Sequence, residues 1–501
     1  MRRHGEVPQA DSTKSLSRRD FLRYAAATGV ALSVAGIPAR VVDAAFVGEL
    51  PPTREFDVIV IGTGMAGLAA AVQAGEQGAR VAILEKQLKP LFGGNSRLAG
   101  GIFAAPEART AEAKAQFIED FLVKGDYRTD ADLIETLADN ILDDIEWLKS
   151  HGVEFLEPSP MAPYRVLGYT AAPASYQGMP KLLDTMLKAA ENLGAETFFQ
   201  TKAQELLVDA SGNVVGVRAK TSKGLVDFRA KATVIATGGF AGNGQMLEQW
   251  VGPDADESMV RGIKWATGDG HIMAANVGAQ LIQMGGVDTL HIAAVHPKNT
   301  ASANPFQVVP YALGINRLGR RYVDESLGYV AHGKAAMNQP GLQVALVFDQ
   351  AVADMPEGQA VISNFDRLGI EIIKANTLDE LAAKINVPAD ALKETVTSFN
   401  AAVQNGQALA ADPPKAAHAV RIEKPPFYAL YPLGPGITLT FGGIRINLRR
   451  QALDADGKPI GGLYAAGECV GGYFLGDYVG GGSLTRCLVD GRIAGRNAAR
   501  A

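Results

Sequence analysis

The sequence predicts an α/β fold that begins with a βαβ unit, and three adjacent features carry this prediction. An apolar strand is expected at Asp57–Ile61, an Ala-rich helix follows it, and a second apolar strand at Ala79–Leu84 ends in Glu85. The turn into the helix carries the glycines of a GxGxxG pattern, which are Gly62, Gly64 and Gly67. This combination of strand, glycine turn, helix, strand and terminal acid is typical of a Rossmann-like unit that binds a dinucleotide.

Each part of this unit has a mechanical role. Gly62 permits the tight turn, Gly64 lets backbone N–H groups approach a pyrophosphate at the helix N-terminus, and Gly67 allows close packing of helix and strand. Glu85 lies 21 residues beyond Gly64 and can accept a hydrogen bond from a ribose hydroxyl. An acid at this position favours an unphosphorylated ribose, so FAD or NAD is predicted rather than NADP. A further apolar strand at Ala232–Ala236 closes a second crossover beside the first.

Composition sets limits on size and partners. With 501 residues, of which 47% are hydrophobic, the chain can bury a large core and is expected to form two domains. The net charge is −5, and no basic run after residue 45 would suit a phosphate backbone, so nucleic acid is not expected as a partner. Cys469 and Cys487 do not have the spacing of a haem, zinc or iron–sulfur site. Both are expected to be small buried residues, and no metal site is predicted.

The N-terminal segment resembles a twin-arginine signal peptide over residues 1–45. Arg18 and Arg19 precede an Ala- and Gly-rich run, Tyr24–Ile37, and Val42-Asp43-Ala44 offers a small-residue cleavage site. The run holds 14 residues, too few to span a bilayer comfortably. The chain is therefore expected in the periplasm of a bacterium, exported in its folded state, and no later stretch is apolar enough for a membrane span.

Beyond Glu85, ordered motifs make the chain resemble the fumarate reductase/succinate dehydrogenase flavoprotein superfamily, which includes ketosteroid dehydrogenases. These motifs are GGNS at Gly93–Ser96, ATGGF at Ala236–Phe240, TGDGHIMAANVGA at Thr267–Ala279 and GLYAAGE at Gly462–Glu468. The resemblance covers roughly residues 55–501. It implies an FAD-binding domain at 54–290 and 437–501, interrupted by an inserted α+β capping domain at 291–436.

The resemblance also implies how FAD is held. Glu468 matches the ribityl-binding glutamate, and backbone N–H groups at Ser483 and Leu484 would face the pyrimidine edge of the flavin. The other residues assigned to the cofactor are Met65, Ala66, Lys86, Gly93, Gly94, Asn95, Ser96, Gly100, Gly101, Ala203, Thr237, Gly238, Gly239 and Asp269. Membrane-bound relatives attach FAD through a histidine near the glycine-rich loop, and the loop Leu91–Gly101 has none. Noncovalent FAD is therefore expected.

On the substrate side the chain departs from the fumarate reductase pattern. Tyr478 stands where an arginine would clamp a carboxylate, and Tyr329 stands where an arginine would donate the proton. Of the histidines that bind a dicarboxylate, His296 alone remains. A phenol cannot supply the guanidinium fork that holds a carboxylate in a bidentate way, so fumarate and succinate are poor substrate candidates.

The same positions match ketosteroid dehydrogenases instead. By that resemblance the Tyr478 hydroxyl and the Gly482 N–H would polarise a carbonyl, Tyr329 would remove the neighbouring proton, and the β-hydride would pass to flavin N5. A free phenol has a pKa of about 10, so Tyr329 would need a hydrogen-bonding or cationic neighbour. Tyr164 and Tyr169 both fit this role, and the sequence does not choose between them.

The predicted function is therefore an exported FAD-dependent oxidoreductase acting on a CH–CH bond next to a carbonyl, in either direction. The partners are a small-molecule substrate and an electron carrier, either a quinone or a periplasmic cytochrome. One alternative is an acrylate-type carboxylate reductase, with Arg165 or Arg445 as the cationic clamp. A flavin oxidase and a non-enzymatic exported flavoprotein are further alternatives.

Two features of the capping region are also expected. Residues 377–403 read as two amphipathic helices, the first opened by a capping box at Thr377–Glu380. Arg320 and Arg321 are expected to form structural ion pairs with Asp324 or Glu325 rather than to touch substrate.

Overall fold

The computed structural model describes residues 51–161, 163–174, 177–289, 291–295 and 303–501, and at residues 291, 329 and 330 it describes the backbone alone. Residues 1–50, which contain the predicted signal peptide of residues 1–45, lie outside the described residues. None of the helices in the described ranges combines the length and the apolar character that a bilayer crossing requires.

A six-stranded sheet forms the base of the nucleotide-binding part. In spatial order its strands are β22 (Gln451–Leu453), β23 (Pro459–Ala465), β11 (Ala232–Ile235), β2 (Val58–Ile61), β3 (Val81–Leu84) and β7 (Glu196–Phe198). The pairs from β23 to β7 are parallel, and β22 is antiparallel. Every residue of β2, β3 and β11 is buried, as in parallel sheets covered on both faces. These three strands confirm the predicted strands to within two residues at each end.

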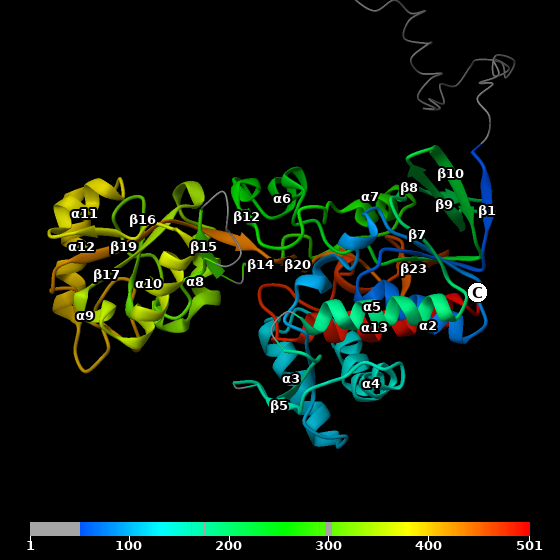
Figure 1. Ribbon diagram of the computed structural model, residues 1–501, viewed down its shortest axis with the longest axis horizontal. Coiled ribbons are helices and arrows are strands. Elements are labelled where there is room, and N and C mark those ends of the chain that lie inside the picture. Colours follow the sequence, from blue (N-terminus) through cyan, green and yellow to red (C-terminus); the bar gives the residue numbers. More distant parts are fainter. Residues whose placement is uncertain (1–50, 162, 175–176, 290, 296–302) are drawn as a thin grey trace, which may run out of the picture. The chain divides into compact units, whose positions relative to one another are not determined.

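The predicted helix after the glycine turn is α2 (Met65–Glu76), and it packs against both α5 (Gly178–Asn192) and α13 (Gly482–Ala498) (Figure 1). Close approach of α2 and α13 depends on two glycines of α13. A Cβ at Gly491 would lie 2.3 Å from the Ala66 carbonyl oxygen, and one at Gly495 would lie 2.2 Å from that of Ala70. Two more helices, α3 (Ala111–Lys124) and α4 (Ala131–Ser150), pack on each other, and α4 also contacts α13.

Smaller elements surround this core. One sheet contains β1 (Thr53–Glu55), β10 (Gly224–Arg229), β9 (Val214–Thr221) and β8 (Lys202–Val208), and another contains β4 (Ile102–Pro106), β6 (Val166–Thr170) and β5 (Ser159–Pro160). The short helices α6 (Gly244–Trp250) and α7 (Asp269–Asn276) lie between these parts and the cap in the chain.

The inserted cap is built on a second sheet. Its path runs through β12 (Met259–Val260), β19 (Phe427–Ile437), β17 (Val344–Asp349) and β16 (Leu313–Asn316), and β15 (His291–Ala294) and β18 (Ile373–Ala375) also pair with β19. Its helices are α8 (Tyr329–Ala336), α9 (Gln350–Ala353), α10 (Pro356–Leu368), α11 (Leu378–Lys384) and α12 (Ala389–Ala402). Neighbouring residues of β17 alternate between two apolar clusters, since Leu346 and Phe348 join one and Ala345 and Val347 the other. The cap sheet is therefore buried on both faces.

The structure confirms the two predicted cap helices as α11 and α12. The Thr377 hydroxyl accepts from the Glu380 N–H at 3.2 Å, which is one half of the predicted capping box. The Glu380 carboxylate reaches back to the Asn376 N–H at 3.0 Å, one residue earlier than a standard capping box.

A buried ion-pair network lies next to α8. Arg321 pairs with Glu325 at 2.8 Å, and Lys415 approaches the same carboxylate at 3.4 Å. The prediction for Arg321 is confirmed. The prediction for Arg320 is wrong, because its side chain pairs with Glu394 of α12 at 2.7 Å instead.

The long strand β19 leads from the cap back to the nucleotide-binding part. Its final residues, Gly436 and Ile437, pair with β12, and it is followed by β20 (Leu439–Thr440) and β21 (Gly443–Ile444). These two short strands pair with β14 (Val287–Asp288) and β13 (Leu281–Ile282). The chain thus enters and leaves the cap through neighbouring strands, and the boundaries at 290/291 and 436/437 stay predictions.

Candidate active site

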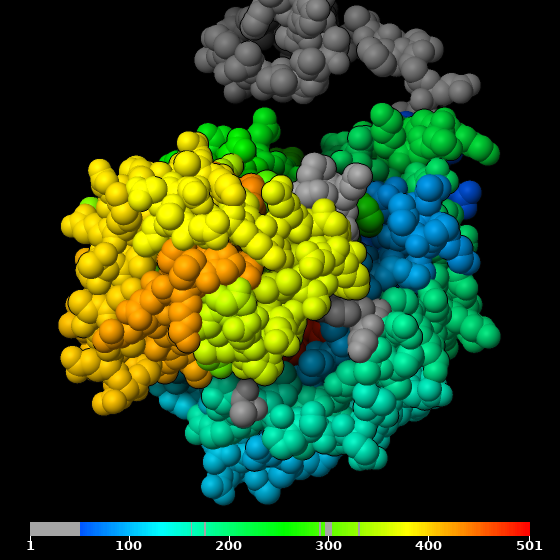
Figure 2. Space-filling model, turned by 60° about the vertical axis from the view of Figure 1, so that its left-hand side comes forward, coloured from blue at the N-terminus to red at the C-terminus, as the bar shows by residue number. Residues whose placement is uncertain are grey.

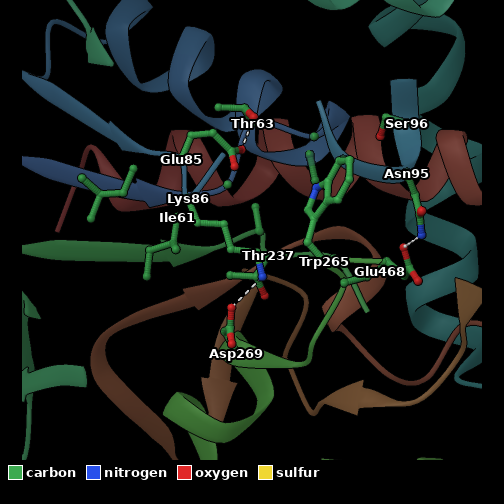
Figure 3. Close-up of a pocket in the computed structure, with 18 of the residues that line it drawn as sticks. Ile61, Thr63, Glu85, Lys86, Asn95, Ser96, Thr237, Trp265, Asp269 and Glu468 are labelled. Atoms are coloured by element: carbon green, nitrogen blue, oxygen red, sulfur yellow. Dashed lines mark hydrogen bonds and ion pairs between the residues drawn. The ribbon is translucent and has the colours of Figure 1, made fainter. Parts of the chain in front are cut away.

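A cleft opens at the carboxyl ends of β2, β3 and β11 (Figure 3). Open α/β sheets commonly bind their ligands outside the carboxyl ends of the strands. The predicted cofactor residues that line it are Gly62, Gly64, Met65, Ala66, Glu85, Lys86, Gly94, Asn95, Ser96, Ala203, Thr237, Gly238, Asp269 and Glu468.

The three glycines of the turn have different roles. Gly62 has φ +109°, and a Cβ there would lie 2.3 Å from the Ala236 carbonyl oxygen. A Cβ at Gly67 would lie 2.1 Å from the Gly62 oxygen, so both positions require glycine for backbone packing. At Gly64 the nearest atom to an added Cβ is Ser96 Oγ at 3.6 Å, and this residue lines the cleft. Gly64 therefore keeps space open for a ligand rather than for the protein's own backbone.

The acid that ends β3 is held in place by its neighbours. Glu85 is buried; its carboxylate accepts a short hydrogen bond from the Thr63 hydroxyl and another from the Gln87 N–H at 2.7 Å. The Thr63 oxygen in turn accepts from the Gly93 N–H at 3.0 Å. Gly93 consequently supports the cleft through Thr63 without lining it.

Lys86 and Asp269 form an ion pair at the edge of the cleft (Figure 3). The Lys86 Nζ lies 2.7 Å from the Asp269 carboxylate, and Lys202 approaches the same carboxylate at 3.0 Å. Although burial opposes ionisation, these two lysines hold the pKa of Asp269 below its ordinary value. The Lys86 Nζ also donates to Thr267 at 3.0 Å, so its charge fixes the α7 N-terminus as well as facing the cleft.

Glu468 lies at the opposite side of the cleft and is buried. Its carboxylate accepts from the Asn95 side chain at 3.0 Å and from the Thr440 N–H at 3.1 Å, and burial raises the pKa of this group. A Cβ at Gly239 would lie 2.3 Å from the Glu468 carboxylate. Gly239 therefore makes room for this acid and does not itself line the cleft.

Several predicted cofactor residues lie outside the cleft lining. These are Gly67, Gly93, Gly100, Gly101, Gly239, Ser483 and Leu484. Gly67, Gly93 and Gly239 support lining residues, whereas Gly101, with φ +81°, packs near Met179 and Ala171. The sequence pattern marks where the backbone is tightly packed, but it does not separate a close approach to a ligand from a close approach to another strand.

The sequence also missed part of the lining. The additional lining residues are Ile61, Thr63, Leu84, Thr201, Lys202, Ala236, Ile263, Trp265, Ala266, Met273, Ala466 and Cys487. Trp265 has the largest of these side chains, and Figure 3 shows it among the residues of the cleft. Its position two residues before the Thr267-Gly268 motif is the only sequence signal that could have identified it.

At two helix N-termini, some backbone N–H groups have no hydrogen-bond partner among the described residues. Such donors suit an anionic, heteroaromatic cofactor. At α2 the Met65 N–H donates to Ser96 Oγ at 3.1 Å, and in the described ranges no hydrogen bond engages the next two amides, those of Ala66 and Gly67. At α13 the amides of Ser483 and Leu484 are likewise without a partner among the described residues. The Gly482 N–H, by contrast, donates to the Val479 oxygen at 2.9 Å. The predicted use of the Gly482 N–H as a carbonyl donor is therefore not supported by this geometry.

Tyr478 lies in the loop before α13, beyond the cofactor cleft. Its half-buried ring contacts Phe441 and Phe474, with ring centroids 6.0 and 5.7 Å away. The preceding residue, Asp477, pairs with Lys124 of α3 at 3.0 Å and with Lys334 of α8 at 3.3 Å. The loop is therefore tied to the cap through the helix that Tyr329 begins. Figure 2 shows a recess beside the yellow and orange cap, with dark red C-terminal residues at its floor.

Of the other predicted catalytic residues, His296 lies outside the described residues, and for Tyr329 only the backbone at the start of α8 is described. Tyr164 contacts the same network, because the Lys124 Nζ lies 5.5 Å from the centroid of its ring. Burial raises the pKa of Tyr164. Tyr169 lies in β6, where its ring is 6.0 Å from the Lys149 Nζ of α4. Of the two tyrosines that the sequence left open, Tyr164 is the one placed beside the Asp477 loop.

The cationic residues considered for a carboxylate clamp are engaged elsewhere. The Arg165 Nε donates to Asp120 at 3.0 Å, and the exposed Arg445 donates to Gln280 at 2.9 Å. Arg261 directly follows β12, and its aliphatic stem lies over Gly436 of β19. Sequence analysis did not identify Arg261, because no motif marks it.

The two cysteines are buried, and burial raises the pKa of each thiol to about 12. Cys469 is structural as predicted, whereas Cys487 also lines the cleft. Among the described residues, no group of three or more His, Cys, Asp or Glu side chains could hold a metal ion.

Two solved structures resemble the whole fold. One is the open conformation of a flavocytochrome c3 fumarate reductase, with TM-score 0.74 and 27% identity over 98% of this chain and 82% of that one. The other is a 3-ketosteroid-Δ4-(5α)-dehydrogenase from Rhodococcus jostii in complex with 4-androstene-3,17-dione, with TM-score 0.72 and 26% identity over 90% of this chain and 100% of that one.

A curated relative is the NADH:acrylate oxidoreductase of Vibrio harveyi, which is 30% identical over 88% of this chain. This chain spans 50% of that protein's length.

The model of the FAD binding domain family matches residues 57–484. This range includes the glycine turn, Glu85, Glu468 and the start of α13, which together carry the donors and acceptors expected to hold FAD. The chain therefore belongs to the FAD binding domain family, and it is an FAD-dependent oxidoreductase.

Proposed function

We propose that this protein interconverts a carbon–carbon single bond and a double bond next to a carbonyl group of a small organic substrate. The observation that carries the proposal is the placement of Tyr478, whose ring packs against Phe441 and Phe474 in a loop tied to α8 by the Asp477–Lys334 ion pair. The helix α8 begins at Tyr329, so two tyrosines distant in sequence belong to elements in direct contact.

Bound FAD supplies the two-electron centre that accepts or donates a hydride. The chain's own residues position the substrate and manage the proton. The Tyr478 hydroxyl donates a hydrogen bond to the carbonyl oxygen and stabilises the enolate charge that develops in the transition state. The aromatic rings beside it form an apolar wall for the body of the substrate. Tyr329, at the cap, exchanges the proton on the carbon next to the carbonyl.

A second candidate is the reduction of an unsaturated carboxylate, as the name of the acrylate relative suggests. It is favoured by the cations that gather near the Asp477 loop, namely Lys124, Lys334 and Arg261. In that case a cation, and not Tyr478, would bind the oxygen end of the substrate.

Anaerobic mixing of the purified flavoprotein with candidate compounds tests the proposal. Saturated ketones are expected to bleach the oxidised flavin, and enones are expected to restore the colour of dithionite-reduced flavin. Restoration by 2-enoates alone would favour the carboxylate reductase. Fast recolouring by oxygen with no response to any organic compound would indicate an oxidase, and no response at all a carrier.

We also propose that the protein is exported by the twin-arginine route and exchanges electrons in the periplasm with a quinone or a cytochrome. The support is the sequence alone, because Arg18 and Arg19 precede a short apolar run. Changing both residues to lysine is expected to leave the folded, yellow protein in the cytoplasm. Cell fractionation followed by flavin fluorescence measures this outcome, and equal periplasmic yields for variant and wild type would contradict the proposal.

A further inference from the structure

Asp288 occupies a position between the cofactor cleft and the cap. It ends strand β14 and pairs with Leu439 of β20, and its carbonyl oxygen accepts from the Thr438 N–H at 2.9 Å. The residues on either side of Leu439 hold the acid and the amide of the cleft. The Thr438 carbonyl accepts from Asn95, and the Thr440 N–H donates to Glu468. Asp288 is therefore one strand away from the residues that face the flavin site.

The Asp288 carboxyl is buried, with 2% of the residue exposed, and its Oδ2 has no hydrogen-bond partner among the residues that the structure describes. Charged groups from four elements act electrostatically on this carboxyl. They are Asp477 from the loop before α13, Arg261 after β12, Lys334 of α8 and Glu468 beyond β23. Burial, followed by the negative charge of Asp477, raises the pKa of Asp288 to about 7, although Arg261 and Lys334 oppose the shift.

Other buried acids of this chain have a plain structural explanation. Glu325 pairs with Arg321 and Asp490 pairs with Arg450, each at 2.8 Å. Asp144 forms a short ion pair with Arg492 through one oxygen, although its Oδ2 also has no hydrogen-bond partner among the described residues. A buried carboxyl with an unsatisfied oxygen beside a reaction site lacks such an explanation, and groups of this kind concentrate at functional positions.

We propose that Asp288 is the proton store of the active site. This inference rests on the proposed function. Reduction of the double bond consumes one hydride, supplied by reduced flavin, and one proton, which a hydroxyl of the site gives to the substrate carbon. The O–H bond of the Asp288 carboxyl then breaks, and its proton restores that hydroxyl. The resulting carboxylate is stabilised by Arg261 and Lys334, and in the desaturation direction the same proton returns to it.

The neighbouring ion pairs provide the connection to solvent. Asp477 lies between Lys124 and Lys334, and the side chains of these two lysines are 33% and 37% exposed. A proton from water can therefore reach the Asp477 carboxylate, whose charge acts on the buried carboxyl of Asp288. Asp288 gives its proton to a hydroxyl of the site and not to the substrate. It is therefore a positioning residue, and it need not touch the substrate.

The first test compares D288N with the matched control D144N, in which a buried aspartate distant from the loop loses its charge. In anaerobic rapid mixing with an enone, the wild-type rate of flavin reoxidation is expected to fall as the pH rises through about 7. D288N is expected to be slower on the order of 10²-fold at pH 6, with a flat profile and a changed solvent isotope effect. D144N should keep the wild-type profile. A D288N profile that keeps the inflection near pH 7 would overturn the proposal.

The second test needs no substrate. Since folding raises the pKa of Asp288 from 3.8 to about 7, the protonated carboxyl favours the folded state. Its contribution is complete below pH 4 and is lost as the pH rises through 7. Asparagine does not titrate, so the Tm of D288N should rise relative to wild type between pH 5 and pH 8. Parallel Tm curves would overturn the proton store whatever the substrate is. If the Tm curves of D288N and wild type diverge but no organic compound reacts with the flavin, the proposed function has failed. The proposed role of Asp288 as proton store then fails as well.

Discussion

Replacing Gly64 by valine is expected to give a folded protein that carries no FAD. The backbone of Gly64 has φ −65° and ψ 176°, which any residue adopts, and a Cβ there meets nothing closer than Ser96 Oγ at 3.6 Å. The chain itself therefore accepts the side chain. The added methyl groups project into the cleft where backbone amides are expected to approach a pyrophosphate, so the cofactor loses its place.

The measurement is the ratio of absorbance at 450 nm to that at 280 nm, with circular dichroism to confirm folding. In the wild type, acid precipitation should leave FAD in the supernatant, since no histidine of the loop Leu91–Gly101 can attach it covalently. The Gly64→Val variant should show no flavin in either fraction. A normal flavin content in this variant would contradict the assignment of the phosphate-binding turn.

Gly67→Ala is the matched comparison, because it changes the same motif for a different reason. Its Cβ would lie 2.1 Å from the Gly62 carbonyl oxygen, so the turn itself must move. Overpacking of this kind costs roughly 1–3 kcal/mol, and the melting temperature of the apoprotein should fall. Apo Gly64→Val should keep the melting temperature of the apo wild type. The two variants therefore distinguish Gly64, which leaves space for the cofactor, from Gly67, which leaves space for the protein's own backbone.

The contrast between these glycines shows what the sequence could predict. Strands β2 and β3 follow from a local pattern of apolar residues, so their ends were predictable within two residues, and helix α2 was expected after the glycine turn. The roles of Gly93 and Gly239 were not, because each supports a polar residue distant in sequence, Thr63 and Glu468 respectively. A glycine motif indicates that the backbone is closely approached by other atoms. It does not show whether those atoms belong to a ligand or to the protein itself.

Part of the cofactor cleft and the substrate side were harder to predict for a related reason. Lys202, Ile263 and Trp265 reach the cofactor cleft through tertiary packing and not through a motif of their own. The Gly482 N–H matched a donor position in the sequence, yet a turn to Val479 engages it. Asp288 carries no motif, and its burial becomes visible only once β14 and β20 are paired.

Tyr478→Phe is expected to keep FAD bound while slowing flavin reduction by a saturated ketone on the order of 10²-fold, the usual effect of removing one donor to a developing oxyanion. The phenyl ring retains the contacts with Phe441 and Phe474, and Tyr478 does not line the cofactor cleft. Only the hydroxyl is lost, so a slower rate with FAD still bound would show that this hydroxyl takes part in the reaction. Tyr329→Phe should slow the reaction by roughly 10² to 10⁴, the usual contribution of a base.

Tyr428→Phe provides the control, because its hydroxyl donates to Gln350 within the cap at 2.7 Å and lies far along β19 from the recess. It should react at the wild-type rate. Arg261→Gln discriminates between the two proposed chemistries in the same rapid-mixing experiment. If a carboxylate is the substrate, this change should disable the enzyme while both tyrosine variants react normally, since a guanidinium and not a phenol would then bind the oxygen end. Wild-type rates in Tyr478→Phe and Tyr329→Phe together would therefore remove the ketone mechanism and leave carboxylate reduction as the function of this site.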